Sequence, residues 1–449
     1  METLNAISPL DGRYYNKVNE LSKYFSEKAL IQYRLKIEVE YFIALSNEPK
    51  IKEVREFSNE ERVILRTLYL KFSEKEAQVV KKIEKKTNHD VKSVEYYLKS
   101  KLPDSLKEYS EFVHFALTSE DINNLSYSLM LKDGYIEYIK NLKKLLKALK
   151  DLSLGNKNIA LLSLTHGQPA TPTTLGKELA VFYMRLINQM KEITLKGKLS
   201  GAVGNFNAQI VAYNNVDWLA FSQNFIELLG LEYNPLTTQI EPHDTSATLY
   251  HQIIRLNNIV KDLDQDMWLY ISRDTFKLKK KPGEVGSSTM PHKVNPIDFE
   301  NSEGNLGLAN AILDHLAMKL PVSRLQRDLT DSTVLRNQGI ALGYSLLGLK
   351  SALKGLGKLE VNKIHIKEEL DNHWEVLAEP IQVVLRKINY PKPYETLKEL
   401  TWGKKIDQEK ITKFIKSLKI NKIEKNKLLK LTPSKYIGIS SKLIDKYLK

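Results

Sequence analysis

The side chains best suited to chemistry fall into three polar clusters that lie far apart in the chain. They occupy 87–90 together with 114–121, then 165–171, and finally 286–296 continuing to Glu300. Each cluster adjoins a helical pattern, so we expect each at a junction between a loop and a helix. Together they offer imidazole, hydroxyl, amide and charged groups, which could supply an acid, a base and an anion-binding surface.

His166 is the histidine of the second cluster. An imidazole exchanges protons near neutral pH, so this side chain could act as a general acid or base. A turn histidine that only caps a helix is the plainer alternative, and for His166 considered alone it is the favoured one.

The third cluster places two serines before a lysine and an asparagine between prolines. A serine is a poor base unless its environment stabilises the alkoxide, so Ser287 or Ser288 would need special surroundings. Lys293, six residues after Ser287, could stabilise a developing carbanion, and Asn295 could donate its amide to a carboxylate. The alternative is an ordinary surface loop rich in serine, glycine and proline.

Several other chemistries lack their motifs. There is no G-x-x-x-x-G-K-[ST] and no G-x-G-x-x-G after a strand, which argues against NTPases and dinucleotide-dependent dehydrogenases. No H-E-x-x-H or dense ligand spacing occurs among the nine histidines, so neither a metal nor a cofactor is expected. No G-x-S-x-G elbow indicates a hydrolase. Acid–base chemistry on an anionic substrate remains.

A second anion-binding set follows Pro321. Ser332 and Arg336 are four residues apart, so on a helix they share one face. A guanidinium beside a hydroxyl is a reasonable phosphate clamp. A salt-bridged helix, in which Arg327 and Arg336 pair with the acids at 328 and 331, is supported equally well by the residues alone.

The N-terminal segment combines a turn at 8–12 with Arg13 and Tyr14. These two side chains could add charge and an aromatic face to an anion site, although the residues alone favour an ordinary Asp-Gly turn. The segment has no basic start followed by an apolar block, so no secretory signal is expected.

Long helices must position these groups. Apolar residues from Leu249 to Tyr270 step by 4, 3, 4, 3, 4 and 3, which is the period of a packed bundle helix. Similar seams run through 136–152, 175–193 and 306–320, with Gly155 and Pro321 as stops. The predicted fold class is therefore an all-α long-helix bundle. Loops are expected at 165–172, 201–208 and 280–296, and 208–213 could at most form a hairpin.

The organisation predicted from these patterns has three domains. They are a mostly helical N-terminal domain at 1–110, a central bundle at 111–365 and a basic helical domain at 366–449. Long apolar stripes need partners, so a homo-oligomer whose subunits complete one bundle is expected. No apolar run reaches about 18 residues, which argues against a membrane partner, and the absence of cysteine fits a cytoplasmic protein.

The net charge of +14 is unevenly distributed. Residues 401–449 contain 14 lysines, no arginine and 4 acidic residues, a net charge of +10. Attraction of nucleic acid is one interpretation. The lysines alternate with isoleucine and leucine and lack stacking aromatics, so a solvated helical surface is favoured and no nucleic-acid partner is expected.

The stretch 287–296 resembles the S-S-x-M-P-x-K-x-N-P loop of the fumarase/aspartase superfamily. The stretches 165–171, 87–91 and 290–293 resemble the adenylosuccinate lyase branch of that superfamily. SPLDGRY near the N-terminus and LPVSRLQRDLTDSTVLRN after the bundle are similar to its bacterial-type subgroup. The resemblance extends from residue 7 to the C-terminal tail.

The resemblance implies roles for the catalytic residues. His166 would protonate the purine nitrogen as it leaves, and Glu300 would orient that imidazole. Ser287 would remove a Cβ proton from the succinyl group, with Ser288 as the adjacent candidate. Lys293 would stabilise the negative charge that builds on the succinyl carboxylates.

The resemblance also implies a substrate-binding set, in which Thr118 and Ser119 lie beside the succinyl carboxylates and Ser332 and Arg336 hold the phosphate. The full set is Arg13, Tyr14, Asn88, His89, Asp90, His114, Thr118, Ser119, Gln239, Ser288, Met290, Asn295, Arg324, Ser332 and Arg336. The implied fold is an all-helical homotetramer whose active sites draw the three distant clusters from different subunits.

The implied reaction is an anti β-elimination of fumarate from a succinyl-purine nucleotide. Adenylosuccinate and the succinyl-aminoimidazole carboxamide ribotide are the two expected substrates. The alternative enzyme is another lyase of the superfamily, such as an argininosuccinate lyase, although its substrate has no phosphate. The alternative that is not an enzyme is a helical protein without catalytic activity. The basic tail is the only feature that supports it.

Overall fold

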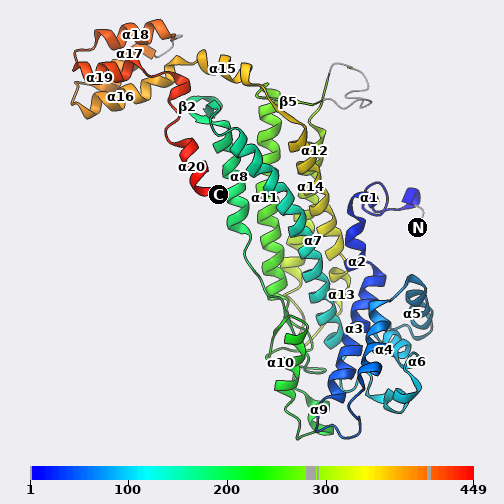
Figure 1. Ribbon diagram of the computed structural model, residues 1–449. Coiled ribbons are helices and arrows are strands. Elements are labelled where there is room, and N and C mark those ends of the chain that lie inside the picture. The colour runs from blue at the N-terminus through cyan, green and yellow to red at the C-terminus, as the bar shows by residue number, and fades with distance from the viewer. Residues whose placement is uncertain (1–2, 280–289, 291–292, 402–405, 449) are drawn as a thin grey trace. The chain divides into compact units, whose positions relative to one another are not determined.

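The computed structural model describes residues 3–279, 290, 293–401 and 406–448 (Figure 1). Helices dominate it, which confirms the all-α prediction. The chain divides into two compact units. Unit 1 comprises Met1–Leu142, Met190–Asn258 and Gly304–Gly348, and unit 2 comprises Lys143–Gln189, Ile259–Glu303 and Leu349–Lys449. The three-domain division expected from the sequence stays a prediction.

Four long helices contribute segments to both units. They are α7 (Ser119–Gly155), α11 (Asp244–Ser272), α12 (Ile297–Lys319) and α14 (Gln338–Lys358). Every apolar position of the Leu249 seam up to Met267 is buried, with at most 1% of each side chain exposed. Helix α7 ends at Gly155 and α12 ends two residues before Pro321, as their stop signals predicted.

Unit 1 also contains the N-terminal helices and several short elements. Its helices are α1 (Tyr15–Val18), α2 (Ser22–Phe25), α3 (Glu27–Ser46), α4 (Asn59–Leu70), α5 (Glu74–Thr87), α6 (Asp90–Ser100), α9 (Asn207–Ala212), α10 (Trp218–Leu228) and α13 (Thr330–Leu335). Its 3-10 turns are η1 (Thr3–Asn5), η2 (Asn19–Leu21) and η3 (Asp104–Phe112), and the parallel strands β3 (Lys196–Gly197) and β4 (Glu232–Tyr233) form one pair. The possible hairpin at 208–213 is wrong, because residues 208–212 belong to α9 and Tyr213 is its C-cap.

Asn257 of α11 joins the four long helices within unit 1. This side chain is fully buried. Its amide donates to Asn310 of α12 (3.0 Å) and Ser345 of α14 (2.9 Å), and its carbonyl oxygen accepts from the Tyr138 hydroxyl of α7 (3.2 Å). A buried polar group is tolerated only when it is hydrogen-bonded, so this junction fixes the register of the helices.

Unit 2 contains a hairpin, a second short strand pair and the C-terminal helices. The strand β1 (Ala160–Thr165) pairs antiparallel with β2 (Gln168–Thr174), and β5 (Phe276–Leu278) pairs antiparallel with β6 (Leu359–Val361). The helices are α8 (Leu175–Gln189), α15 (Lys363–Asp371), α16 (Ala378–Lys387), α17 (Pro393–Thr401), α18 (Gln408–Ser417), α19 (Lys422–Leu429) and α20 (Ser440–Tyr447), with 3-10 turns η4 (Trp374–Leu377) and η5 (Pro433–Lys435). The loop expected at 165–172 is therefore wrong, because its residues form most of a hairpin.

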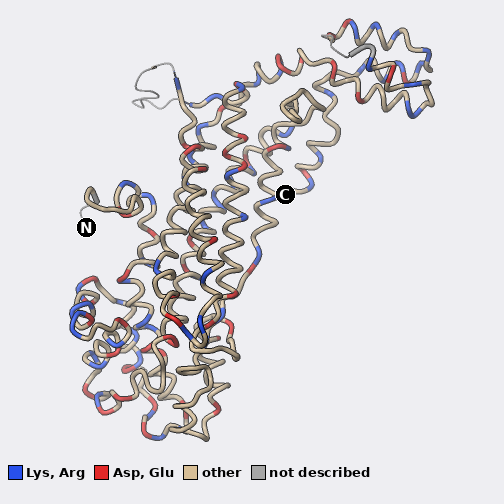
Figure 2. Tube along the Cα trace, turned by 180° about the vertical axis from the view of Figure 1, so that it is seen from behind, with Lys and Arg blue, Asp and Glu red and all other residues tan. Residues whose placement is uncertain are grey.

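The C-terminal helices and Leu162 of β1 bury a shared apolar core. Leu385, Leu397, Ile411 and Leu428 belong to it, while lysines such as Lys413 remain exposed. Basic and acidic residues both occur along this part of the trace (Figure 2). This pattern supports the solvated-surface interpretation of the basic tail. Among the described residues, no helix is both long and apolar enough to cross a membrane.

Candidate active site

The corner between α5 and α6 carries Asn88, His89 and Asp90. Asn88 ends α5 in the left-handed conformation (φ 51°), which asparagine tolerates better than most residues. His89 caps α6, since its Nδ1 accepts the backbone N–H of Lys92 (3.1 Å). The imidazole is otherwise exposed.

Asp90 and Arg336 are brought together in unit 1. A carboxylate oxygen of Asp90 pairs with Arg34 (2.8 Å) and Arg336 (3.1 Å), and Arg336 also pairs with Glu27 (3.1 Å). Burial opposes ionisation of Asp90, but the two guanidinium groups hold its pKa below the usual value. The pairing of Arg336 with the acids at 328 and 331, which the sequence left open, is therefore wrong.

His114 is held by a buried carboxylate. Its backbone has φ 61°, and its Nδ1 lies 2.5 Å from Glu38 Oε1. Burial works against protonation of His114, yet the charge and hydrogen bond of Glu38 raise its pKa above the ordinary value. Glu38 thus favours the protonated form of His114, which suits an anionic ligand.

Thr118 and Ser119 stand at the start of α7. The Thr118 N–H donates to Asp121 Oδ2 (2.9 Å), and Asp121 pairs with Lys198 (2.9 Å) where both side chains are fully buried. The same carboxylate accepts the backbone N–H of Ser200 (3.0 Å). This buried ion pair fixes the first turn of α7, whose N–H groups and partial positive charge favour an anion.

Gln239 and Ser332 lie on two other segments of unit 1. The Gln239 side chain accepts from Arg327 Nη1 (3.1 Å) and donates to the carbonyl oxygen of Ala202 (2.9 Å). Ser332 belongs to the short helix α13, and its backbone N–H donates to Asp331 Oδ1 (2.6 Å). Both residues are thus fixed by neighbours that leave part of each side chain accessible.

Arg13 and Arg324 are exposed members of the predicted binding set, and Tyr14 is half-buried. The Arg13 guanidinium lies 5.8 Å from the centre of the Tyr14 ring, which suits a cation–π contact. Arg324 has 78% of its side chain exposed and pairs with Asp328 (3.4 Å). A cavity of about 290 Å³ lies between residues 8–26 and the start of α14, and Arg336 lines it.

His166 occupies the tip of the hairpin in unit 2. His166 (φ 53°) and Gly167 (φ 71°) both have positive φ, as a two-residue hairpin turn requires. The imidazole is exposed. The strands behind it are anchored, because Leu162 is buried in the C-terminal core and Thr171 donates a hydrogen bond to Glu379.

The other predicted catalytic and substrate-binding residues of unit 2 lie before and at the start of α12. Lys293 and Glu300 are exposed, Asn295 is half-buried and Met290 is 45% exposed. Glu300 accepts the indole N–H of Trp268 (3.1 Å), so its expected role of orienting His166 stays a prediction. Ser287 and Ser288 lie outside the described residues.

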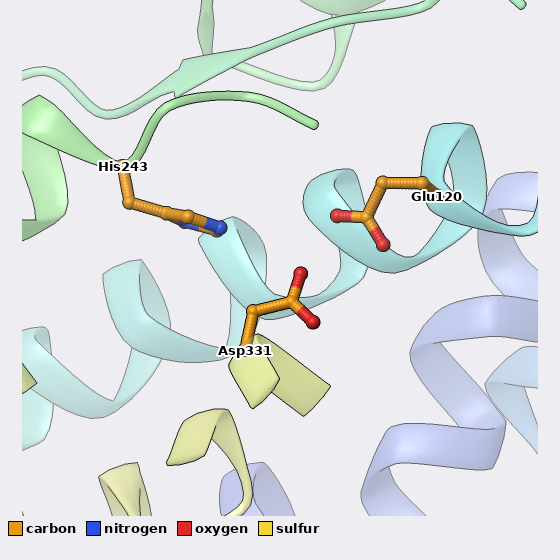
Figure 3. Close-up of side chains that lie close together, drawn as sticks. All are labelled: Glu120, His243 and Asp331. Atoms are coloured by element: carbon orange, nitrogen blue, oxygen red, sulfur yellow. The ribbon is translucent and has the colours of Figure 1, made fainter. Parts of the chain in front are cut away.

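A buried cluster in unit 1 was missed by sequence reasoning. Glu120, His243 and Asp331 are all buried, and one polar atom from each lies within 4.8 Å of the other two (Figure 3). They come from α7, from the residue before α11 and from α13. No sequence signal could have joined them, since their separations of 123 and 88 residues follow no motif.

The two units offer complementary chemistry. Unit 1 places guanidinium, imidazole and hydroxyl groups where anions can be bound. Unit 2 places an imidazole, a lysine and a carboxylate at exposed positions, where they can exchange protons or stabilise charge.

Two protein-family profiles together match most of the chain. One, described as lyase, matches residues 12–311, and another, described as adenylosuccinate lyase C-terminal, matches residues 323–437. Among curated relatives, the adenylosuccinate lyase of Escherichia coli strain K12 is 52% identical over 451 residues, with 99% of each chain covered. Those of Haemophilus influenzae and Legionella pneumophila strain Corby are each 51% identical, and the alignments cover at least 99% of every chain.

Two solved structures share the fold. The fumarate lyase from Mesorhizobium sp. BNC1 superimposes with a TM-score of 0.75 and 17% identity, covering 96% of this chain and 97% of that one. The 3-carboxy-cis,cis-muconate lactonizing enzyme from Pseudomonas putida gives the same TM-score and identity, with 96% of each chain covered. At this identity the likeness concerns the fold alone.

Proposed function

Because the chain belongs to the adenylosuccinate lyase family, we propose that it eliminates fumarate from adenylosuccinate to give AMP. The second substrate is the succinyl-aminoimidazole carboxamide ribotide. The observation that carries this proposal is an identity of 52% over 99% of both chains with a curated enzyme of that name. The guanidinium and imidazole groups of unit 1 agree with a substrate that carries carboxylates and a phosphate.

The reaction breaks one C–H bond and one C–N bond. Ser287 takes the Cβ proton of the succinyl group, and the electron pair forms the double bond of fumarate as the C–N bond breaks. His166 delivers a proton to the leaving nitrogen, so the purine departs neutral at that atom. Ser288 is the alternative base, and Glu300 orients the imidazole of His166.

Stabilisation of charge accompanies these proton transfers. Removal of the Cβ proton places negative charge on the adjacent carboxylate, which becomes a dianion. Lys293 and Asn295 stabilise that carboxylate with a positive charge and an amide donor. Thr118 and Ser119 hold the succinyl carboxylates at the first turn of α7, where the helix dipole favours negative charge.

The remaining binding residues hold the nucleotide. Arg336 and Ser332 bind the phosphate, because a guanidinium and a hydroxyl can form several charge-assisted hydrogen bonds to its oxygens. Arg336 already faces Asp90 and Glu27, so an incoming phosphate exchanges one anionic partner for another. His89 and His114 contribute further donors.

The active enzyme is a homotetramer in this proposal, with each site built from more than one subunit. The exposure of His166, Lys293 and Glu300 in the single chain supports completion by neighbouring copies. The cytoplasmic location, and the absence of a nucleic-acid partner, stay predictions from the sequence.

An ultraviolet assay tests the proposal. Purified protein is mixed with adenylosuccinate, and the absorbance change of the purine is followed as AMP forms. Turnover is the expected result. A flat trace from folded protein with both succinyl-purine substrates contradicts it, and turnover of argininosuccinate would assign the alternative lyase activity.

A further inference from the structure

Three glycines on the long helices of unit 1 face the N-terminal segment 8–26. Gly134 belongs to α7, and Gly339 and Gly343 belong to the first two turns of α14. Glycine disfavours helix formation relative to alanine, so local helix stability does not account for it at these positions. The side chains of the N-terminal segment do, because two of them approach the three glycines more closely than any larger residue would allow.

The side chain of Phe25 lies between α14 and α7. A Cβ atom added to Gly134 would lie under 3.0 Å from Cε2 and Cζ of the ring, and one added to Gly339 would lie under 3.0 Å from Cβ and Cγ of Phe25. Carbon atoms that are not bonded to each other pack at about 3.5–4.0 Å, so neither position accepts a larger residue while Phe25 stays in place. Gly134 and Gly339 thus form a socket for Phe25.

A second contact holds the beginning of the same segment. Leu10 is only 7% exposed, and a Cβ atom added to Gly343 would lie 2.8 Å from its Cδ1. The backbone N–H of Tyr14 donates to the carbonyl oxygen of Pro9 (2.8 Å), which closes the turn around Leu10. Because this turn is held by a backbone hydrogen bond, the position of Leu10 also sets the backbone positions of Arg13 and Tyr14.

The two anchors, Leu10 and Phe25, lie on either side of Arg13 and Tyr14 in the chain. They also border the cavity of about 290 Å³ beside the start of α14. Both anchors, the two glycines of α14 and Arg336 line this cavity. The glycines therefore set the spacing between the segment that carries two predicted nucleotide-binding residues and the predicted phosphate-binding guanidinium.

We propose that Gly134 and Gly339 are positioning residues for nucleotide binding. By accepting Phe25, they hold the segment 8–26 at a distance from Arg336 at which both can contact one nucleotide. Pre-organised groups bind a ligand more tightly, because less freedom is lost on binding. The proposal rests on the proposed function where substrate affinity is the readout. A role in stability alone would lower Tm and leave KM unchanged.

The geometry predicts that one substitution repairs another. Gly134→Ala collides with the tip of the Phe25 ring, so KM for adenylosuccinate should rise about tenfold while kcat stays within about threefold of wild type. Phe25→Leu ends the side chain near the position of Cδ2, which lies 3.5 Å from the added Cβ, an ordinary contact. Phe25→Leu alone should change KM less than about threefold, and adding it to Gly134→Ala should restore that smaller value.

Three further variants separate the socket from other effects. Gly339→Ala collides with Phe25 Cβ, an atom that leucine retains, so Phe25→Leu should not repair its rise in KM. Gly357→Ala, further along α14, meets no other part of the described chain within 4 Å and should leave KM unchanged. Phe25→Ala empties the socket without a collision and should also raise KM, which keeps the test valid if Gly134→Ala does not fold. An unchanged KM in Phe25→Ala, or no repair of Gly134→Ala by Phe25→Leu, would overturn the proposal.

Hydrogen–deuterium exchange tests the socket without turnover. Backbone amides of residues 8–26 should exchange faster in Gly134→Ala than in wild type, and adding Phe25→Leu should slow them again. Peptides from α8 in unit 2 are the internal control and should exchange equally in all variants. Unchanged exchange over 8–26 in Gly134→Ala contradicts the proposal. If exchange follows the expected pattern but the wild type turns over neither succinyl-purine substrate, the proposed function fails and the socket stands.

Discussion

The two units hold their predicted site residues in different ways. In unit 1, Asp90, His114 and Gln239 each contact a charged side chain, so their positions are fixed within one chain. In unit 2, His166 and Lys293 are exposed at the tip of a turn and before a helix. Under the proposed function, this contrast means that one chain pre-organises these three predicted binding residues, whereas the predicted catalytic groups are left for another surface to complete.

The largest expected effect concerns the exposed imidazole of unit 2. His166→Ala should lower kcat by about 10² to 10⁴, because a general acid typically contributes that much, while Tm stays near the wild-type value. Steady-state kinetics and thermal unfolding provide the measurement. His365→Ala on α15 is the matched control in the same unit and should leave kcat nearly unchanged. Near-normal turnover of His166→Ala would refute the role.

Mixing of inactive subunits tests the contrast directly. His166→Ala and Ser287→Ala proteins should each be inactive, and activity should return when their subunits are dissociated together and reassociated. Recovery is expected because some mixed sites would receive both intact residues from different chains. Absence of recovery, with mixed oligomers demonstrated by a size or mass tag, would mean that one chain builds the whole catalytic set.

A smaller effect is expected for the pre-organised binding unit. Arg336→Ala should lower kcat/KM about 10- to 100-fold, mostly through KM, because a charge-assisted hydrogen bond is worth about 1.5–3 kcal/mol. Glu27→Gln is the control, since it removes an ion-pair partner of Arg336 and leaves the guanidinium in place. A comparable loss in Glu27→Gln would assign the effect to the ion pair and not to phosphate binding.

The smallest effect is a shift in a titration. Glu38 raises the pKa of His114, so Glu38→Gln should lower the midpoint measured for that imidazole by NMR. The stability contributed by this pair is fully present below the unfolded histidine pKa of about 6.5 and is lost as pH rises through the folded value. The wild type should therefore exceed Glu38→Gln in Tm most at acidic pH. A pH-independent difference would argue against the charge pairing.

The long helices could be predicted because their apolar period is local information. The seam on α11 and the stop at Gly155 both match the structure. The hairpin at 160–174 was missed, because Pro169, Pro172 and Gly167 are typical of a loop in sequence. Proline is compatible with an edge strand, and a two-stranded sheet has only edges.

The candidate site was predictable only where a motif was continuous. Family resemblance selected His89, His114 and Ser332 from short stretches, and their roles stay predictions. The Glu120–His243–Asp331 cluster depends on tertiary packing of segments that no local pattern connects. The positive φ angles of His114 and His166 could not be predicted from the sequence either, because histidine does not require this backbone conformation.

The backbone of the His166 turn implies a conflict between durability and turnover. A non-glycine residue in the left-handed region costs about 1 kcal/mol, whereas glycine enters it freely. Position 166 would thus tolerate glycine or asparagine well if only folding mattered. A library enriched solely for heat resistance should drift away from histidine at this turn, and the survivors should be robust proteins that no longer process substrate.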